Sequence, residues 1–326
     1  MIWLTWRQLR TQATLTLAVL AVLVIVLAAT GPQLADLHTT AGRGLIQQLT
    51  GTDTTLYFAG GVAVLVLPVL LGMFWGAPLV ARELETGTHR LVWNQGVTRT
   101  RWLLTRLALT GLVAMAATGL VSLAVSWWAD PIDQAVATGG SDNGDNFVPR
   151  IAPATFLIRG ITPLGYAVFA FVLGVTLGVI IRRTLPAMAA ALATYTTLQL
   201  VMPMWVREHL APTTTITVPF TPDRLANYGL DSVSQVEFGK PDVWVTAEQT
   251  LDGTGHPAHA MPPGYADCES IKECVSSLTR AGYQQRITYQ AANNFWTLQW
   301  AEAGVYLALA IGLGALAVRW TRKRLS

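Results

Sequence analysis

The sequence predicts an all-α polytopic membrane protein with six transmembrane helices and a small extracellular α+β domain between the fifth and sixth helices. Hydrophobic residues make up 52% of the chain, charged residues make up only 13%, and the mean hydropathy is +0.41. So few charges do not cover the surface of a soluble globule of 326 residues. The charges are also confined to segments between long apolar stretches, each of which has the length of a bilayer-spanning helix.

Six stretches have this character. Five of them contain no charged residue, and they lie at 11–35, 54–81, 107–129, 160–181 and 184–206. The sixth, about 297–318, contains one charge, Glu302, near its beginning. If that helix enters the bilayer near Thr297, Glu302 lies about 7 Å along the axis at a rise of ~1.5 Å per residue. We therefore expect its carboxylate to reach the headgroup level, and Glu302 is a candidate for a substrate path.

The distribution of arginines predicts the orientation, because positive charge marks short cytoplasmic segments. With the N-terminus inside, the cytoplasmic segments contain only Glu83 and Glu85 as acidic residues, against many basic residues. The basic set is Arg7, Arg10, Arg82, Arg90, Arg99, Arg101, Arg106, Arg182, Arg183, Arg319, Arg322, Lys323 and Arg324. Both termini of this plasma-membrane protein are therefore predicted to be cytoplasmic. A cleaved signal ending near Ala28 is an alternative for the first stretch, but five further spans favour an uncleaved helix.

The chain is predicted to begin with an interfacial helix at residues 1–12, in which Trp3 and Trp6 share a broad apolar face and Arg7 points away. The transmembrane region 13–206 follows. Its first span is expected to end at Gly31-Pro32, because the dipeptide stops a helix.

The prolines of the second span, Pro68 and Pro78, predict a kinked and buried helix. The third span is expected to end at the interfacial pair Trp127-Trp128.

The fourth and fifth spans are separated by little more than Arg182-Arg183, so they are expected to form an antiparallel hairpin. Gly174 and Gly178 lie on one face of the fourth span and permit close helix contact, either within one subunit or between two.

Residues 207–296 form the predicted extracellular domain. Alternating patterns predict four strands and one helix, at Thr215–Phe220, Val233–Phe238, Val243–Thr246, Arg286–Tyr289 and Cys268–Arg280. The two cysteines of the chain, Cys268 and Cys274, both lie here. In an oxidising exterior they are expected to form a disulfide, although two reduced cysteines are an alternative. The 297–326 segment then supplies the sixth span and a basic cytoplasmic tail.

Several kinds of chemistry are missing from the sequence. A phosphate-binding loop needs Gly-Lys followed by Ser or Thr, but the sole Gly-Lys pair, Gly239-Lys240, precedes Pro241. We therefore expect no nucleotide hydrolysis and no cofactor in this chain. It also lacks a metalloprotease motif, a serine-hydrolase elbow and any nucleic-acid motif. His256 and His259 are best interpreted as solvated loop histidines, so no metal site is predicted.

The deep parts of the predicted spans contain no carboxylate, histidine or lysine. Transport coupled to protons would have no groups to use there. The same absence favours a hydrophobic or amphipathic cargo over a small polar ion.

The segment 81–101, between the second and third spans, has the strongest pattern. Gly87 is expected to end one helical piece, Thr88 to cap a second, short one, and Thr98 to cap the third span. The short helix would present Leu91 and Trp93 across the membrane face. This is suited to docking in a cleft of a soluble partner, although a loop that lies on lipid has the same character.

This segment resembles the first cytoplasmic loop of the ABC-2 exporter permeases, which reads like Arg-Glu-x-x-x-Gly-Thr, an apolar pair and then Ser/Thr-Arg. The matching residues are Arg82-Glu83, Glu85, Gly87-Thr88, Leu91-Val92 and Thr98-Arg99. Gly96 stands where the family often has proline. The start of the chain, with Trp3, Trp6 and Arg7, is similar to the family's interfacial connecting helix. The resemblance covers residues 1–206 and 297–326.

The resemblance implies that two copies of this permease work with two copies of a cytoplasmic ABC ATPase, which binds ATP and Mg, and that membrane lipid surrounds them. It assigns an ATPase-coupling role to Arg82, Glu83, Glu85, Gly87, Thr88, Arg90, Leu91 and Trp93. The expected activity is export of a drug, antibiotic or lipid, as in multidrug efflux. One alternative is a sensory or mechanotransmission complex in which the external domain binds a ligand and nothing crosses. A membrane-embedded enzyme is a third and more distant alternative.

Overall fold

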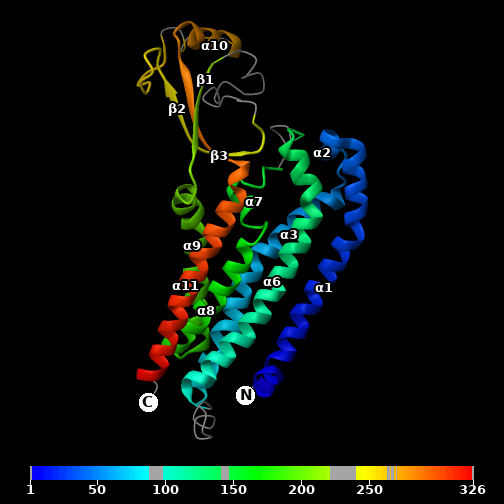
Figure 1. Cartoon of the computed structure of the whole chain (residues 1–326), viewed down its shortest axis with the longest axis vertical. Helices are drawn as coiled ribbons and strands as arrows, with labels where there is room; N and C mark the ends of the chain where they lie inside the picture. The colour runs from blue at the N-terminus through cyan, green and yellow to red at the C-terminus, as the bar shows by residue number, and fades with distance from the viewer. Residues whose placement is uncertain are drawn as a thin grey trace.

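A bundle of long helices carries a small sheet at one end, and both described ends of the chain lie at the opposite end (Figure 1). The computed structural model describes residues 2–87, 98–140, 147–220, 240–262, 265, 268 and 270–324. Within them, 6 helical stretches are long and apolar enough to cross a membrane. These are Ala13–Gln48, Gly51–Glu85, Thr100–Ala137, Thr162–Ile181, Thr184–His209 and Ala292–Lys323. The predicted number of spans is therefore confirmed.

Helix α1 runs without interruption from Ile2 to Ala41, with Pro32 inside it. Two expectations therefore change: no break separates residues 1–12 from the first span, and Gly31-Pro32 does not end the helix. Packing against the third span accounts for the continuous helix. Gly31 lies directly against the Trp127 ring, because a Cβ on Gly31 would be 2.5 Å from it. The short helices η1 (Gly42–Gly44) and α2 (Leu45–Gln48) then reverse the chain.

The second span consists of α3 (Gly51–Leu70), the π-helical turn η2 (Leu71–Gly76) and α4 (Ala77–Glu85). A capping box starts α3, in which the Thr50 hydroxyl and the Asp53 carboxylate each accept from the other residue's backbone N–H. Pro68 lies just before η2, and a proline removes one donor from the helical ladder. The expected irregularity of this span is thus present as a π-helical turn.

The third span, α6 (Arg99–Ala137), begins as predicted, because the Thr98 side chain accepts a hydrogen bond from the backbone of Arg101. It does not end at Trp127-Trp128 but continues to Ala137. Trp128 is buried, and its indole donates to the Thr30 hydroxyl at 2.9 Å. This tryptophan therefore joins α6 to α1 within the bundle instead of marking an interface. The short helix α7 (Pro153–Phe156) follows.

The fourth and fifth spans form the predicted hairpin. Helix α8 (Thr162–Ile181) ends at Arg182, which adopts φ +60°, and α9 (Thr184–Val201) begins two residues later. The π-helical turn η3 (Met202–Val206) and the 3-10 turn η4 (Arg207–His209) extend α9. A Cβ on Gly178 would lie 2.6 Å from the carbonyl oxygen of Ala77, and a Cβ on Gly174 would clash with the backbone of Gly72. The glycine face of α8 therefore contacts the second span of the same chain.

The sheet has three antiparallel strands in the order β1-β3-β2, namely β1 (Thr214–Pro219), β2 (Val243–Leu251) and β3 (Gln284–Ala291). Helix α10 (Ile271–Arg280) packs on it through Val275 and Leu278, which meet Ile287 and Tyr289 of β3. Cys268 and Cys274 form the predicted disulfide. Three of the four predicted strands are confirmed, and 233–238 lies outside the described residues.

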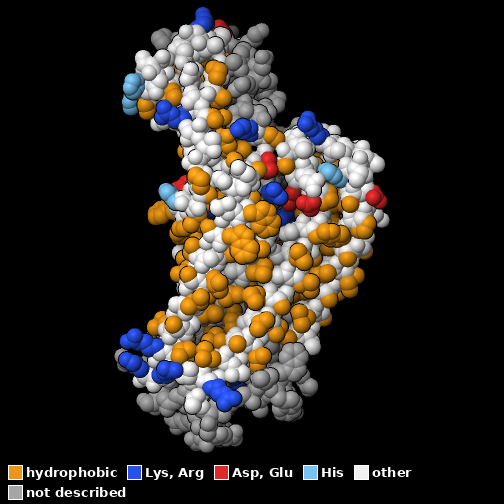
Figure 2. All heavy atoms as spheres, in the orientation of Figure 1, with side chains coloured by type: hydrophobic (Ala, Val, Ile, Leu, Met, Phe, Trp, Pro, Cys, Tyr) orange, Lys and Arg blue, Asp and Glu red, His pale blue; other side chains and the backbone are white. Residues whose placement is uncertain are grey.

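The turn η7 (Ala292–Asn294) joins β3 directly to α11 (Phe295–Arg324), the last span, which packs along α8. Hydrophobic side chains cover the visible face of the bundle, and Lys and Arg gather at the end opposite to the sheet (Figure 2). Val19, Leu123 and Ile311 are each more than half exposed on this bundle. An apolar exterior of this extent is typical of helices that face lipid.

Candidate functional site

The end of the bundle opposite to the sheet, which we call the basic end, brings together four pieces of chain. They are the end of α4, the start of α6, the α8–α9 turn and the end of α11. Direct polar contacts join them: Glu83 to Arg106, Glu85 to Thr184, and Arg322 to Thr100. The segment between α4 and α6, which contains the predicted coupling residues, starts and ends here.

Glu83 and Arg106 form the contact between α4 and α6. The guanidinium Nη1 lies 2.6 Å from the Glu83 carboxylate, and the side chains are only 16% and 4% exposed, respectively. Nη1 also donates to the carbonyl of Leu79 at 3.2 Å, and the guanidinium lies over the Trp102 ring. A charge pair that is shielded from water in this way is stronger than one on the surface, because it is less screened. The two helix ends are thus held in one relative position.

Glu85 forms the contact between α4 and α9. Its Oε2 accepts from the backbone N–H of Thr184 at 3.1 Å and from the Thr184 hydroxyl at 2.8 Å. The N-cap residue of α9 is Arg183, whose side chain makes no capping hydrogen bond. A carboxylate at a helix N-terminus satisfies a free N–H and interacts favourably with the helix dipole. Glu85 therefore caps α9 from another helix.

Next to these contacts lies an open groove of about 730 Å³ between α1, the second span and α9. Its wall is mostly apolar and contains residues such as Leu15, Leu70, Phe74 and Met188. Leu15 and Phe74 are 69% and 51% exposed. Arg82, Glu85 and Thr184 lie at its polar end, so the groove borders the Glu85 contact.

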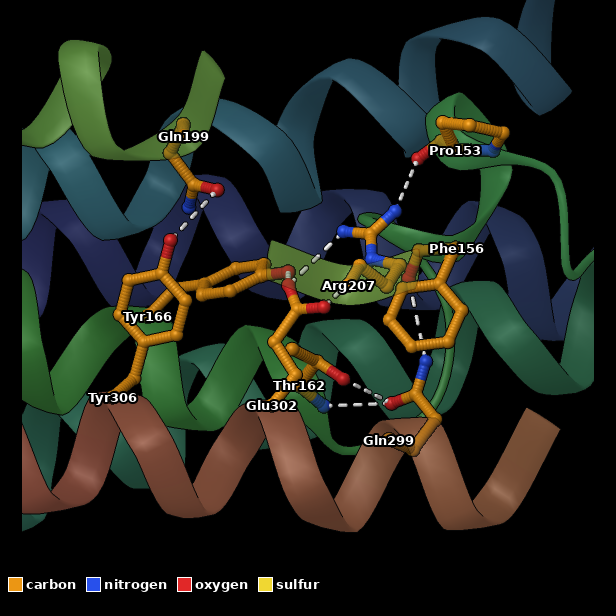
Figure 3. Close-up of polar contacts among 9 residues, drawn as sticks. All are labelled: Pro153, Phe156, Thr162, Tyr166, Gln199, Arg207, Gln299, Glu302 and Tyr306. Carbon is orange, nitrogen blue, oxygen red and sulfur yellow. Dashed lines mark hydrogen bonds and ion pairs between the residues drawn. The ribbon is translucent and has the colours of Figure 1, made fainter. Parts of the chain in front are cut away.

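A second polar centre lies near the sheet, between the last two spans. Both side chains of the Arg207–Glu302 ion pair are 0% exposed, and Nε lies 2.6 Å and Nη2 lies 3.0 Å from the carboxylate oxygens. Figure 3 shows the guanidinium of Arg207 between this carboxylate, the carbonyl of Pro153 and the ring of Phe156. The Tyr166 hydroxyl donates to Glu302 as well. Every charged atom has partners, as buried ions require.

Glutamines continue this network along α11. The Gln299 Oε1 accepts from the backbone N–H groups of Ile161 and Thr162, at 2.9 and 2.8 Å, and from the Thr162 hydroxyl (Figure 3). It caps α8, whose own N-cap residue Ile161 has no polar side chain. Tyr306 donates to Gln199 at 3.5 Å, which links α11 to α9. The last span is therefore joined to α8 and α9 by buried polar side chains.

A third buried pair, Arg159 with Asp133, lies where the bundle meets the sheet, with Nε 2.8 Å from the carboxylate. Charged side chains are visible at this junction in Figure 2. The guanidinium also lies over the ring of Tyr57. Asp242, just before β2, lies close enough for its charge to interact with that of Asp133, and its burial raises the pKa of the Asp242 carboxyl. One acidic group from the sheet side, Asp242, thus lies close to the Arg159–Asp133 pair of the bundle side.

A family model described as ABC-2 membrane transporter related matches residues 17–207, more than half of the chain. The chain belongs to this family. No curated protein and no solved structure matches it. The chain is therefore an ABC-2 permease, a membrane transporter component that works in the context of an ABC ATPase partner.

The match extends across this ABC-2 permease from α1 to the first residue of η4. It includes the segment between α4 and α6 and the residues that line the apolar groove, except Leu15 and Thr16 of α1. The sheet and α11 lie beyond it. Arg207 is the last matched residue, whereas its partner Glu302 is outside.

The ABC-2 permease brings part of the predicted coupling set together. Arg82, Glu83 and Glu85 lie on the last turn of α4, and Gly87 follows with φ +74°, a conformation that favours glycine. Thr88, Arg90, Leu91 and Trp93 lie outside the described residues, as do the side chains of Trp3, Trp6 and Arg7. The coupling role of all these residues stays a prediction.

Glu302 has partners that the sequence pattern does not indicate. Its carboxylate is fully buried against Arg207 and Tyr166, and its position at the headgroup level stays a prediction. It does not line the apolar groove. In this conformation it supports the packing of α11, and its assignment to a substrate path stays a prediction.

The partners of these charges cannot be identified from the sequence pattern; they are Arg106, Thr184, Arg207 and the pair Asp133–Arg159. One signal was present, because an ionisable residue inside a span is costly and therefore implies a partner. Which partner is chosen depends on the packing of α11 against α9, and periodicity within a single helix does not contain this information.

Proposed function

We propose that this ABC-2 permease is the transmembrane subunit of an ATP-driven exporter for a hydrophobic or amphipathic substrate such as a drug, antibiotic or lipid. Two copies form the translocation path in the plasma membrane, and each binds one separate cytoplasmic ATPase subunit that holds ATP and Mg. The Glu83–Arg106 contact carries this proposal, because it connects the predicted coupling segment to a transmembrane helix.

The coupling follows from how the segment is fixed at its two ends. At its start, α4 is held to α6 by Glu83 and to α9 by Glu85. At its end, Thr98 caps α6 directly. A force applied to this segment by an ATPase is therefore delivered to α4, α6 and α9 together. Because α4 and α9 also line the apolar groove, a movement of these helices changes its shape.

The groove supports the substrate class. A pocket with an apolar wall and a few polar groups at one end is suited to an amphipathic molecule. Its residues Leu15, Leu70 and Phe74 face outward from the single chain. In the proposed dimer the second copy covers this face, and the substrate passes between the two copies.

In this proposal the basic end is cytoplasmic and the sheet with its disulfide is extracellular. The orientation is supported by the arginines at the basic end and by the disulfide, since disulfides persist in oxidising compartments.

The test is co-reconstitution of the permease with its ATPase in vesicles, followed by ATP hydrolysis with and without a transported apolar dye. Glu83→Gln weakens the ion pair to Arg106, and Gly87→Val forces a β-branched residue into a positive φ. We expect each to lower dye-stimulated hydrolysis by about tenfold, since coupling free energies are typically about 1–3 kcal/mol.

The matched control is Glu248→Gln, which removes the same charge from an exposed position on β2. It should leave the stimulation unchanged. Thermal unfolding of each purified variant separates a loss of coupling from a loss of folding. Full stimulation and full dye transport in both coupling variants would contradict the proposal.

A second candidate function is a sensory or mechanotransmission complex without transport. It is favoured by two features: β3 continues through η7 into α11, and Gln290 of β3 donates to the carbonyl of Ala211, just after the fifth span, at 2.9 Å. A ligand on the sheet would thus act directly on two spans. ATP hydrolysis that responds to an external ligand, in vesicles that move no dye, would favour this candidate.

A further inference from the structure

A second groove, of about 810 Å³, lies between α6 and α11 at the basic end. It is lined by Thr100, Leu104, Leu107, Ile311, Gly314, Ala315, Val318, Arg319, Arg322 and Lys323. Its two walls come from different spans, and Leu104 and Ile311 are 49% and 66% exposed. We call it the α6–α11 groove. It is separate from the apolar groove, with which it shares no lining residue.

The α6–α11 groove is divided along its length into an apolar part and a cationic part. Ile311, Ala315 and Val318 come first along α11, and Arg319, Arg322 and Lys323 follow at its mouth. From Ile311 to Lys323 the helix rises about 18 Å at ~1.5 Å per residue. The hydrocarbon part of one leaflet is about 15 Å deep, which is half of a ~30 Å core. About 10 Å of this rise, from Ile311 to Val318, is apolar, so the groove covers roughly two thirds of the acyl chains of one leaflet when the headgroup lies at the cations.

The three cations of the groove lie within about one helical turn of α11. Arg322 Nε donates to the Thr100 hydroxyl at 2.8 Å, which fixes the guanidinium at the mouth of the groove. A smaller adjoining hollow of about 500 Å³ adds Arg101, and it shares Thr100, Leu104 and Arg322 with the groove. None of the residues that line the two hollows is acidic. Unbalanced positive charge at this point attracts an anion.

We propose that the α6–α11 groove is a binding site for an anionic phospholipid. The phosphate is held by Arg319, Arg322 and Lys323, and one acyl chain lies against Leu104, Leu107 and Ile311. Arginines that only mark the cytoplasmic side of a membrane protein need no groove next to them. A phospholipid site needs both the cations and an apolar groove that continues from them. The site goes beyond the proposed function and does not depend on it.

The test is native mass spectrometry of the full-length protein with added phosphatidylglycerol or, separately, phosphatidylcholine with the same acyl chains. We expect the wild type to prefer the anionic lipid. The double variant Arg319→Gln, Arg322→Gln should weaken phosphatidylglycerol binding by about 25-fold, at about fivefold for each lost cation near the membrane surface.

The matched control is Arg182→Gln, Arg183→Gln, which removes two exposed arginines from the α8–α9 turn at the same end. It should keep the preference for the anionic lipid. Equal affinity of the wild type for both lipids, or an equal loss in the two double variants, would overturn the proposal, because either would indicate general charge attraction.

A third variant tests the apolar half of the site. Ala315 is exposed in the groove, so Ala315→Trp should fill it while all the cations stay in place. We expect bound phosphatidylglycerol to be lost from this variant, and inorganic phosphate at millimolar concentration not to displace the lipid from the wild type. Unchanged lipid binding by Ala315→Trp, or displacement by inorganic phosphate, would show that the acyl chain does not occupy the groove.

Discussion

The Arg207–Glu302 pair buries two full charges where neither has contact with solvent. Removing a charge from water is costly, and the cost is offset only when each charge has close partners. Here the Glu302 carboxylate accepts hydrogen bonds from the Arg207 guanidinium and the Tyr166 hydroxyl. The guanidinium also donates to the carbonyl of Pro153. At the scale of single residues, the position of α11 is therefore specified by one ion pair and its hydrogen bonds.

Arg207→Met should destabilise the protein by about 3–5 kcal/mol, because it leaves the Glu302 carboxylate buried without its cation. Replacing both residues by Met should recover most of this loss, since no charge then stays buried. The measurement is equilibrium unfolding in detergent. Arg183→Gln, an exposed arginine, serves as the control and should change little. A double variant that is as unstable as Arg207→Met would show that the pair is not the source of the effect.

At the scale of elements, the second span and α8 approach closely along a seam of small residues. Gly72, Gly76, Gly174 and Gly178 lie on it, and a Cβ on Gly76 would come within 2.5 Å of the Phe171 carbonyl oxygen. Without side chains in between, the backbones gain van der Waals contact, which is the main attraction between helices in lipid. The π-helical turn η2 lies within this seam.

Gly178→Ala should destabilise the helix pair by about 1–3 kcal/mol, because the new methyl group would lie 2.6 Å from the Ala77 carbonyl oxygen and would force the helices apart. Gly312→Ala is the matched control on α11, where nothing lies within 4 Å of the added methyl group. It should be neutral or slightly stabilising, since alanine is the better helix former. Thermal unfolding of the two variants in the same detergent provides the comparison. A similar midpoint for both would contradict the close packing of the seam.

At the scale of the whole molecule, the sheet and the basic end lie at opposite ends of one bundle (Figure 1). The chain crosses the length of the bundle 6 times, so its two ends return to the same side. The polar contacts that we propose to take part in coupling are at the basic end, and those that fix α11 are near the sheet. The long helices are therefore the physical connection between these two groups of contacts.

The proposed orientation can be tested with a membrane-impermeant maleimide on intact cells. His259→Cys places an exposed thiol in the sheet region, and Arg183→Cys places one at the basic end. We expect the first to be labelled in intact cells and the second only after lysis, because the bilayer blocks the reagent. The wild type, whose two cysteines are joined in a disulfide, serves as the unlabelled control. The reverse labelling pattern would show that the protein has the opposite orientation to the one proposed.

The number of spans, the α8–α9 hairpin, the position of the sheet along the chain, the disulfide and the resemblance to the family can all be predicted from the amino-acid sequence. They depend on local properties, namely apolar length, turn residues and motif spacing. Three other features become visible in the folded protein: α1 continues past Pro32, Trp128 is internal, and Glu83 and Glu302 contact Arg106 and Arg207. The physical reason is that such choices depend on atoms brought together from distant parts of the chain, where close packing and the cost of burying charge override local preference.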